Sequence, residues 1–346
     1  MTRFSLESGR ILALFSLCAC TSGQVLEAGG PRSTMSEVVP PMAAAGAPAQ
    51  QEVLAPAPVD GGVREQLLTR APQGQGGALG PPLRPLPEHV FGVTLTDVSP
   101  LEGLRDALAA LSHRPTVRVV FDIRRQAVTY LPALHELRAV SYVMGELVDS
   151  VSVTHLSVDA YAARTSDYLN ELAEHVDIWE VGNEVNGEWL GPGDKVQAKV
   201  ITAYHQVKER DKRTALTLYY NQGCVQKPEH ELFVWAERHI PTDMRQGLDY
   251  VWVSYYEQRC HGAEPDWNQL FARLHLMFPH AKLGIGGCGA SDPAQKAELI
   301  QHFYGLDVDL PSFVGGYFWW YFREDMVPAS APLWGVLNDS WLRSPL

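Results

Sequence analysis

One carboxylate in this sequence is set in surroundings that suggest chemistry. Glu184 follows Asn183 directly after the apolar run Ile178–Val181. Packing explains a carboxyl group at the end of a buried strand poorly, because a polar group in a tight apolar setting costs free energy unless it is used or paired. The chemistry that Glu184 could supply is proton transfer as a general acid or base. The alternative is structural, with Glu184 forming an internal salt bridge or a helix-capping contact.

The elements that must position Glu184 repeat along the last three quarters of the chain. Short apolar runs alternate with helical stretches, which is the pattern of βα units and a parallel sheet. The runs are Val90–Val93, Val117–Phe121, Val140–Met144, Ile178–Val181, Ala215–Tyr220, Tyr250–Tyr255, Lys282–Ile285 and Phe313–Trp319. Helices are predicted at Leu101–Leu111, Tyr130–Arg138, Ala160–His175, Lys195–Glu209, Glu229–His239, Trp267–Met277 and Pro293–Tyr304.

Eight strands over residues 89–346 predict a (β/α)₈ barrel, whose usual size matches this length. The competing fold is a doubly wound open sheet, which normally carries a glycine-rich loop after its first strand. Here the first run leads into Thr94-Leu95-Thr96-Asp97, without a G-x-G-x-x-G motif. The barrel is therefore favoured, and its chemistry is expected at the ends of the strands.

The stretch Trp179-Glu180-Val181-Gly182-Asn183-Glu184 resembles the large clan of retaining glycoside hydrolases built on (β/α)₈ barrels. The mark of that clan is Asn-Glu at the end of the fourth strand, and here it falls at the fourth of eight predicted strands. The resemblance implies that Glu184 is the general acid/base and that Asn183 contacts the 2-hydroxyl of a sugar.

A retaining mechanism needs a second carboxylate about 5 Å from the first. In this clan it is a Glu at the end of strand 7, in a run such as Gly-Ile-x-Glu-x-Gly. This sequence reads Leu283-Gly284-Ile285-Gly286-Gly287-Cys288-Gly289, so Gly287 occupies the nucleophile position. No Asp or Glu occurs between Ala281 and Ser291.

Three interpretations of Gly287 remain open. The chain could bind glycans without cleaving them. It could be a hydrolase with a relocated carboxylate, for which Glu257 after strand 6 is the best candidate and Asp122 after strand 2 a more remote one; a separation of about 6.5–9.5 Å would then imply inversion. Finally, Gly287 could replace the Glu of an active ancestor.

Other strand ends supply candidate sugar contacts. Tyr255 ends strand 6, where the clan carries an aromatic residue or His beside the nucleophile, and Trp189 follows strand 4. Trp320 follows strand 8, where the clan places a Trp under the reacting sugar. Aromatic faces suit the C–H faces of pyranose rings. Arg118, within strand 2, is either a substrate-site residue or an interior ion-pair partner.

The amino terminus predicts export. Arg3 and Arg10 precede the short apolar run Ile11–Leu17, as in a signal peptide over residues 1–20. Its end resembles the bacterial lipobox, with Cys20 as the lipidated residue; an ordinary secretory signal is the alternative. Residues 21–88 hold 11 of the 24 prolines and no Phe, Trp or Tyr. They cannot bury enough apolar surface to fold and predict a disordered Pro/Ala/Gly-rich linker.

Composition and cysteine placement limit the partners. The net charge is −12 with no basic patch evident in the sequence, which argues against nucleic acid as a partner. Export predicts an oxidising compartment, and Cys224 and Cys260 follow adjacent strands, so we expect a disulfide between them. No metal or organic cofactor is implied. We expect an exported monomer in the cell envelope, touching the membrane only through its lipid and binding a carbohydrate.

Overall fold

The computed structural model describes residues 83–256, 260 and 262–345. The predicted signal peptide, Cys20 and the predicted linker as far as residue 82 lie outside the described residues, as does Glu257. Among the described helices, none combines the length and apolar character that a membrane span requires.

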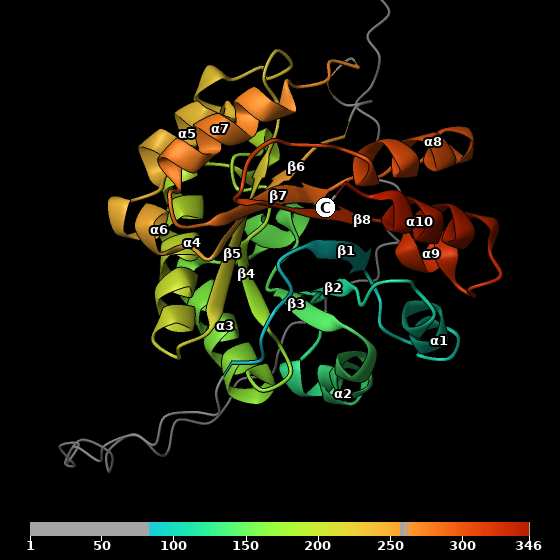
Figure 1. Ribbon diagram of the computed structural model, residues 1–346. Helices are drawn as coiled ribbons and strands as arrows, with labels where there is room; N and C mark the ends of the chain where they lie inside the picture. The colour runs from blue at the N-terminus through green and yellow to red at the C-terminus, as the bar shows by residue number, and fades with distance from the viewer. Residues whose placement is uncertain (1–82, 257–259, 261, 346) are drawn as a thin grey trace, which may run out of the picture. The chain divides into compact units, whose positions relative to one another are not determined.

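Eight parallel strands close into a barrel in sequence order, β1 pairing with both β2 and β8 (Figure 1). The predicted (β/α)₈ barrel is therefore confirmed, and each apolar run of the sequence corresponds to one strand. The strands are β1 Val90–Leu95, β2 Thr116–Val120, β3 Tyr142–Glu146, β4 Ile178–Gly182, β5 Arg213–Tyr219, β6 Tyr250–Ser254, β7 Lys282–Gly287 and β8 Phe313–Trp319.

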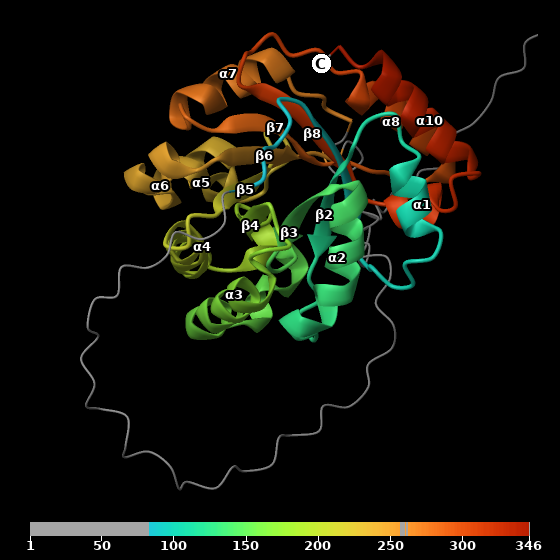
Figure 2. The ribbon, with the colours of Figure 1, turned by 60° about the horizontal axis from the view of Figure 1, so that its bottom comes forward.

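Helices surround the barrel, and Figure 2 shows α2 and α3 outside β2, β3 and β4. The seven predicted helices are present with boundaries shifted by a few residues, and three more follow β5 or β8. The α-helices are α1 Leu104–Ala109, α2 Leu131–Val140, α3 Val158–Leu172, α4 Gly193–Lys208, α5 Leu232–His239, α6 Thr242–Gly247, α7 Trp267–Met277, α8 Pro293–Tyr304, α9 Phe322–Met326 and α10 Pro332–Arg343. Short 3₁₀ helices are η1 Ala127–Tyr130, η2 Ser150–His155, η3 Glu188–Leu190 and η4 Pro228–His230.

Apolar side chains form two separate regions. The larger lies between the strands and the helices, and the smaller fills the inside of the barrel. Inside, Trp252 from β6 stacks on Tyr250 and meets Phe318 from β8 edge-on, with ring centroids 5.1 and 5.3 Å apart. These rings close the barrel axis below the mouth, so that the mouth has an apolar floor.

The last strand is irregular, and its irregularity decides which aromatic side chains face inward. Gly315 and Gly316 have φ of 89° and 91°, a region that favours glycine, and the pairing with β1 shifts by a residue beyond them. Tyr317 and Phe318 also have positive φ, of 70° and 36°. Phe318 consequently points into the barrel.

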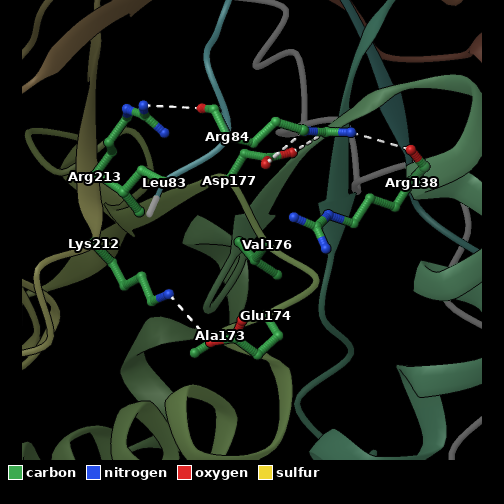
Figure 3. Close-up of a pocket in the computed structure, with 9 residues that line it drawn as sticks. All are labelled: Leu83, Arg84, Arg138, Ala173, Glu174, Val176, Asp177, Lys212 and Arg213. Carbon is green, nitrogen blue, oxygen red and sulfur yellow. Dashed lines mark hydrogen bonds and ion pairs between the residues drawn. The ribbon is translucent and has the colours of Figure 1, made fainter. Parts of the chain in front are cut away.

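The base of the barrel is closed by residues that the sequence analysis assigned to the linker. The guanidinium of Arg84 pairs with the carboxylate of Asp177, which precedes β4, and donates to the carbonyl oxygens of Arg138 and Ser141 at 3.1 and 3.0 Å (Figure 3). Leu86 packs against the apolar interior. The linker boundary at residue 88 is thus too late, because Arg84 and Leu86 already belong to the fold.

Replacing Arg84 by Ala should destabilise the barrel by about 2–4 kcal/mol, because it leaves the nearly buried carboxylate of Asp177 without its cation. Urea unfolding measures this change. Arg105→Ala is the matched control, since its ion pair with Glu136 is solvent-exposed and should contribute less than about 1 kcal/mol. Equal losses in the two variants would contradict a closing role for Arg84.

Candidate functional site at the mouth of the barrel

Glu184 lies at the mouth, just beyond β4, in a backbone conformation that is unusual for a side-chain-bearing residue. Its φ is 47°, in the left-handed region that costs a non-glycine residue about 1–2 kcal/mol. Strained residues of this kind cluster at functional sites. The Ser150 hydroxyl, at the start of η2, donates to Oε2 of Glu184 at 3.2 Å. The Glu184 carboxyl is thus held in place while 7% of the residue stays exposed.

The turn that carries Glu184 is fastened on both sides. The Asn183 amide oxygen accepts from the backbone N–H of Ser150 at 3.3 Å, and its NH₂ group donates to Oε1 of Glu180 at 3.2 Å. Asn186 bonds to the backbone of Tyr219 through both ends of its amide, at 2.7 and 2.8 Å. The turn is therefore tied to the loop after β3 and to the end of β5.

Below the turn lies a buried ion cluster that the sequence analysis only partly anticipated. Arg118 from β2 is fully buried and faces Glu180 from β4 in a two-pronged pair, Nε lying 2.9 Å from Oε2 and Nη2 donating to Oε1 at 3.0 Å. Glu146, at the end of β3, lies 3.7 Å from Nε. Thr217 also donates its hydroxyl to Glu180. Arg118 is therefore an interior ion-pair partner.

Two buried carboxyls share one cation, so they cannot ionise equally easily. Burial raises the pKa of Glu146 well above its usual range, and the charge of Glu180 raises it further. Burial also raises the pKa of Glu180, but Arg118, Thr217 and Asn183 oppose that shift. Neither oxygen of Glu146 has a hydrogen-bond partner within the described part of the chain. Glu146 is consequently the member of the pair that holds a proton more readily.

The position of Gly287 relates it directly to this cluster. A Cβ atom built on Gly287 would lie 3.0 Å from the Ser254 hydroxyl, 3.1 Å from the Tyr256 hydroxyl and 3.6 Å from Nη1 of Arg118. Nη1 of Arg118 and the Ser254 hydroxyl are buried and have no hydrogen-bond partner among the described residues. A side chain at position 287 would therefore enter the mouth directly over Arg118.

Trp189 and Trp320 remain candidates for sugar contact. Trp189 in η3 is 39% exposed, and its ring meets that of Tyr219 edge-on at 5.2 Å. Trp320 is partly exposed just past β8. Its neighbour Trp319 is buried and donates its indole N–H to Asp325 in α9 at 2.9 Å. Of the two, Trp320 is therefore the one that a ligand could reach.

Tyr255 is not a sugar-contacting residue, and that prediction was wrong. It is 1% exposed, and its ring packs among Tyr220, Trp267 and Phe303 in the region outside the strands. The next residue, Tyr256, places its hydroxyl beside Gly287. The aromatic residue of strand 6 that faces the mouth is therefore Tyr256.

The cysteines near the site are structural. Cys224 and Cys260 form a disulfide between the loops after β5 and β6, with Cα atoms 5.2 Å apart. Cys288 is buried, and its thiol donates to the carbonyl oxygen of Tyr317 at 2.9 Å. Burial raises the pKa of that thiol well above its usual value, which disfavours the reactive thiolate.

Two further carboxylates were candidates for a partner of Glu184. Asp122 is engaged by Arg124, whose guanidinium donates at 2.9 and 3.1 Å, and Glu257 lies outside them. Asp149, beside Ser150 at the mouth, was missed by the sequence analysis, as were Glu146 and Glu180. Their position inside or shortly after an apolar run was the sequence signal that could have identified these three residues.

No group of metal-ligating side chains occurs among the residues described.

Comparisons with known proteins support the fold. No protein-family model and no curated protein matches the sequence. The structure of Saccharomyces cerevisiae Gas2p in complex with laminaripentaose is similar, with a TM-score of 0.50 and 14% identity over 74% of this chain and 65% of that one. Gas2p in complex with laminaritriose and laminaritetraose gives a TM-score of 0.48 and 14% identity, covering 74% and 64%. This chain thus spans less than two thirds of the length of Gas2p. At this identity the likeness shows the barrel fold alone.

Replacing Glu146 by Gln should stabilise the protein at alkaline pH. Because the folded state raises the pKa of Glu146 above the unfolded value near 4.5, the wild type loses stability as the pH rises from that value toward the folded pKa. The variant lacks this loss. We expect its urea midpoint to exceed that of the wild type at pH 8 and to approach it at pH 4. A lower midpoint at pH 8 would mean that Arg118 requires an ionised Glu146; Glu136→Gln, at an exposed position, is the control.

Proposed function

We propose that this barrel binds an oligo- or polysaccharide across its mouth, in a site of the retaining glycoside hydrolase type whose hydrolytic activity is impaired. The observation that carries the proposal is the direction in which a side chain at position 287 would point. Such a side chain would enter the mouth over Arg118, on the strand where the resemblance places the nucleophile. Asn183-Glu184 stands at the end of the fourth strand, as the same resemblance requires.

Glu184 would serve as the acid/base of this site. A general acid protonates the leaving oxygen of a glycosidic bond and, as a base, later activates water. The strained backbone and the Ser150 hydroxyl support this role, because they fix the carboxyl before any substrate arrives. Asn183 is oriented by its bonds to Ser150 and Glu180, as expected of a group that binds a sugar hydroxyl.

Gly287 explains why turnover would be impaired. In retention the second carboxylate attacks the anomeric carbon and forms a covalent intermediate. Glycine offers no group for that attack. Glu146 and Glu180 do not replace it, because both are buried against Arg118 and have no exposed surface with which to reach a sugar. A two-carboxylate reaction would therefore need a carboxylate from another loop. Glu257 is the residue that the sequence favours for this role.

The same observation favours a second candidate function, which is glycan binding without cleavage. A mouth with Asn183, Glu184 and two reachable tryptophans, but with glycine at position 287, could still hold a saccharide. The amino-terminal sequence suggests the cellular location of this binding. We propose an exported protein, anchored through a lipid on Cys20, that presents the barrel in the bacterial cell envelope.

The choice of sugar begins with laminari-oligosaccharides, since Gas2p, whose barrel is similar, has been solved in complex with laminaripentaose. At 14% identity this selects a first probe and does not assign a substrate. A panel of aryl glycosides and other polysaccharides is therefore needed beside it.

Restoring the carboxylate tests the proposal most directly. We expect Gly287→Glu to raise the hydrolysis of at least one aryl glycoside by about 10³-fold or more over the wild type, because it returns the missing nucleophile. Initial rates of aglycone release measure this gain, and product stereochemistry followed by NMR should show retention.

Gly287→Ala is the matched control. It adds the same Cβ between the Ser254 and Tyr256 hydroxyls but no carboxylate, so its activity should stay at the wild-type level. Glu184→Gln in the Gly287→Glu background should abolish the gain. The carbohydrate proposal fails if Gly287→Glu folds, remains inert on the whole panel and, like the wild type, binds no saccharide.

Trp189 gives an independent test of saccharide binding. Trp189→Ala should weaken the binding of the tightest oligosaccharide in the panel by about five- to tenfold, because it removes an exposed aromatic face beside the mouth. Trp189→Phe should keep most of the affinity. Calorimetric titration measures both, and an unchanged dissociation constant for Trp189→Ala would remove Trp189 from the site.

A further inference from the structure

A small, partly open hollow lies at the base of the barrel, at the opposite end from Glu184. It lies where the strands begin, next to Asp177 before β4 and Arg213 in β5. Charged side chains make up most of its lining (Figure 3), namely Arg84, Arg138, Glu174, Asp177, Lys212 and Arg213. A site of this composition is suited to a charged ligand.

Two of the four cations in the lining are already paired. Arg84 is held by the carboxylate of Asp177, and the ammonium group of Lys212 lies 3.5 Å from Oε1 of Glu174. Asp177 also accepts from the backbone N–H of Val143 at 2.8 Å, so its oxygens are well supplied with donors. The two carboxylates of the hollow are thus committed to Arg84 and Lys212.

The other two cations have no carboxylate partner among the described residues. Nε of Arg138 and Nη1 of Arg213 are buried and without a hydrogen-bond partner in that part of the chain. In Figure 3 the guanidinium group of Arg138 points toward the middle of the lining residues. Within the described ranges, Arg213 donates through Nη2 alone, to the carbonyl oxygen of Arg84 at 3.0 Å. Counting the described residues, the lining of the hollow therefore has two more cations than carboxylates and two buried donors without acceptors.

Such a state is costly for the protein alone. A buried donor that loses water without gaining an acceptor costs more than an ordinary hydrogen bond returns. Guanidinium groups are planar forks that match the oxygens of phosphate or sulfate, and charge-assisted bonds of this kind are strong. An oxyanion in the hollow would supply hydrogen-bond acceptors to Arg138 and Arg213 and would also balance their charge. A neutral ligand would supply acceptors without balancing the charge.

We propose that the hollow at the barrel base is a binding site for a tetrahedral oxyanion of the phosphate or sulfate type, held by Arg138 and Arg213. The anion is either free in solution or the phosphoryl headgroup of a lipid. The site is separate from the mouth, and it does not depend on the function proposed for Glu184.

Thermal unfolding of the full chain in inorganic phosphate tests the site. We expect phosphate to raise Tm in a saturable manner, by about 2–5 °C, relative to sodium chloride at equal ionic strength, because a ligand that binds only the folded state stabilises it. Arg138→Gln should lower the phosphate affinity at least about tenfold, since it removes a charge-assisted donor. Without phosphate this variant should unfold at the wild-type temperature or above.

Arg124→Gln is the matched control, because Arg124 is exposed and pairs with Asp122 after β2, away from the base. It should retain the full response to phosphate. The proposal is overturned if the wild type responds to phosphate no more than to chloride and also fails the vesicle measurement below. It is equally overturned if Arg138→Gln responds as the wild type does in both measurements.

Vesicles distinguish the two sources of the anion. Full-length wild type and Arg138→Gln share the same amino terminus, so any contribution of a lipid anchor cancels between them. Preferential sedimentation of the wild type with phosphatidylcholine vesicles that contain phosphatidic acid, lost in Arg138→Gln, would identify a headgroup. A response to free phosphate with equal sedimentation of the two proteins would identify the soluble anion.

Discussion

The burial of one arginine organises the upper half of this barrel. Arg118 cannot reach water from within β2, so a carboxylate must neutralise it, and Glu180 on β4 makes that close pair. Glu146 lies beside them, at the matching position of the β3–β4 register. Removing one member of a buried pair costs about 3–5 kcal/mol, because an uncompensated charge remains. Glu180 in turn orients Asn183, so the geometry of the mouth is coupled to the solvation of Arg118.

Both ends of the barrel hold unequal numbers of acidic and basic groups, and the imbalance is relieved differently at each end. At the mouth one cation serves two buried carboxyls, and the excess acidity is relieved by raising the pKa of Glu146. At the base four cations surround two carboxylates, and arginine cannot relieve the imbalance by losing its proton. The cations at the base therefore require either water or an external anion, whereas the charge of Arg118 at the mouth is balanced by Glu180 within the protein. The apolar floor of Trp252 and Phe318 separates the two ends.

Gly287 leaves the arrangement of the surrounding groups in place but supplies no carboxylate. The surrounding groups still define a direction for a side chain at that position, toward Nη1 of Arg118 and two hydroxyls. The strained turn at Glu184 is likewise retained. In the function proposed above, Asn183 and the reachable tryptophans would hold a saccharide, while covalent catalysis would need the carboxylate that glycine at position 287 does not supply. Under that proposal, saccharide binding and turnover would depend on different residues of the site.

The sequence by itself determined the eight strands, seven of the ten described α-helices, the strand that carries Asn183-Glu184 and the glycine at position 287. These follow from local periodicity and from the order of elements, which a closed barrel preserves. Tertiary structure alone decided that Tyr256 and not Tyr255 faces the mouth. Strands of a barrel are buried on both faces and read as continuous apolar runs, so their sequence does not reveal which alternate residues point inward. The partners of Arg118 and Arg84 were also beyond the sequence, because buried charges are paired across strands by register and closure rather than by spacing along the chain.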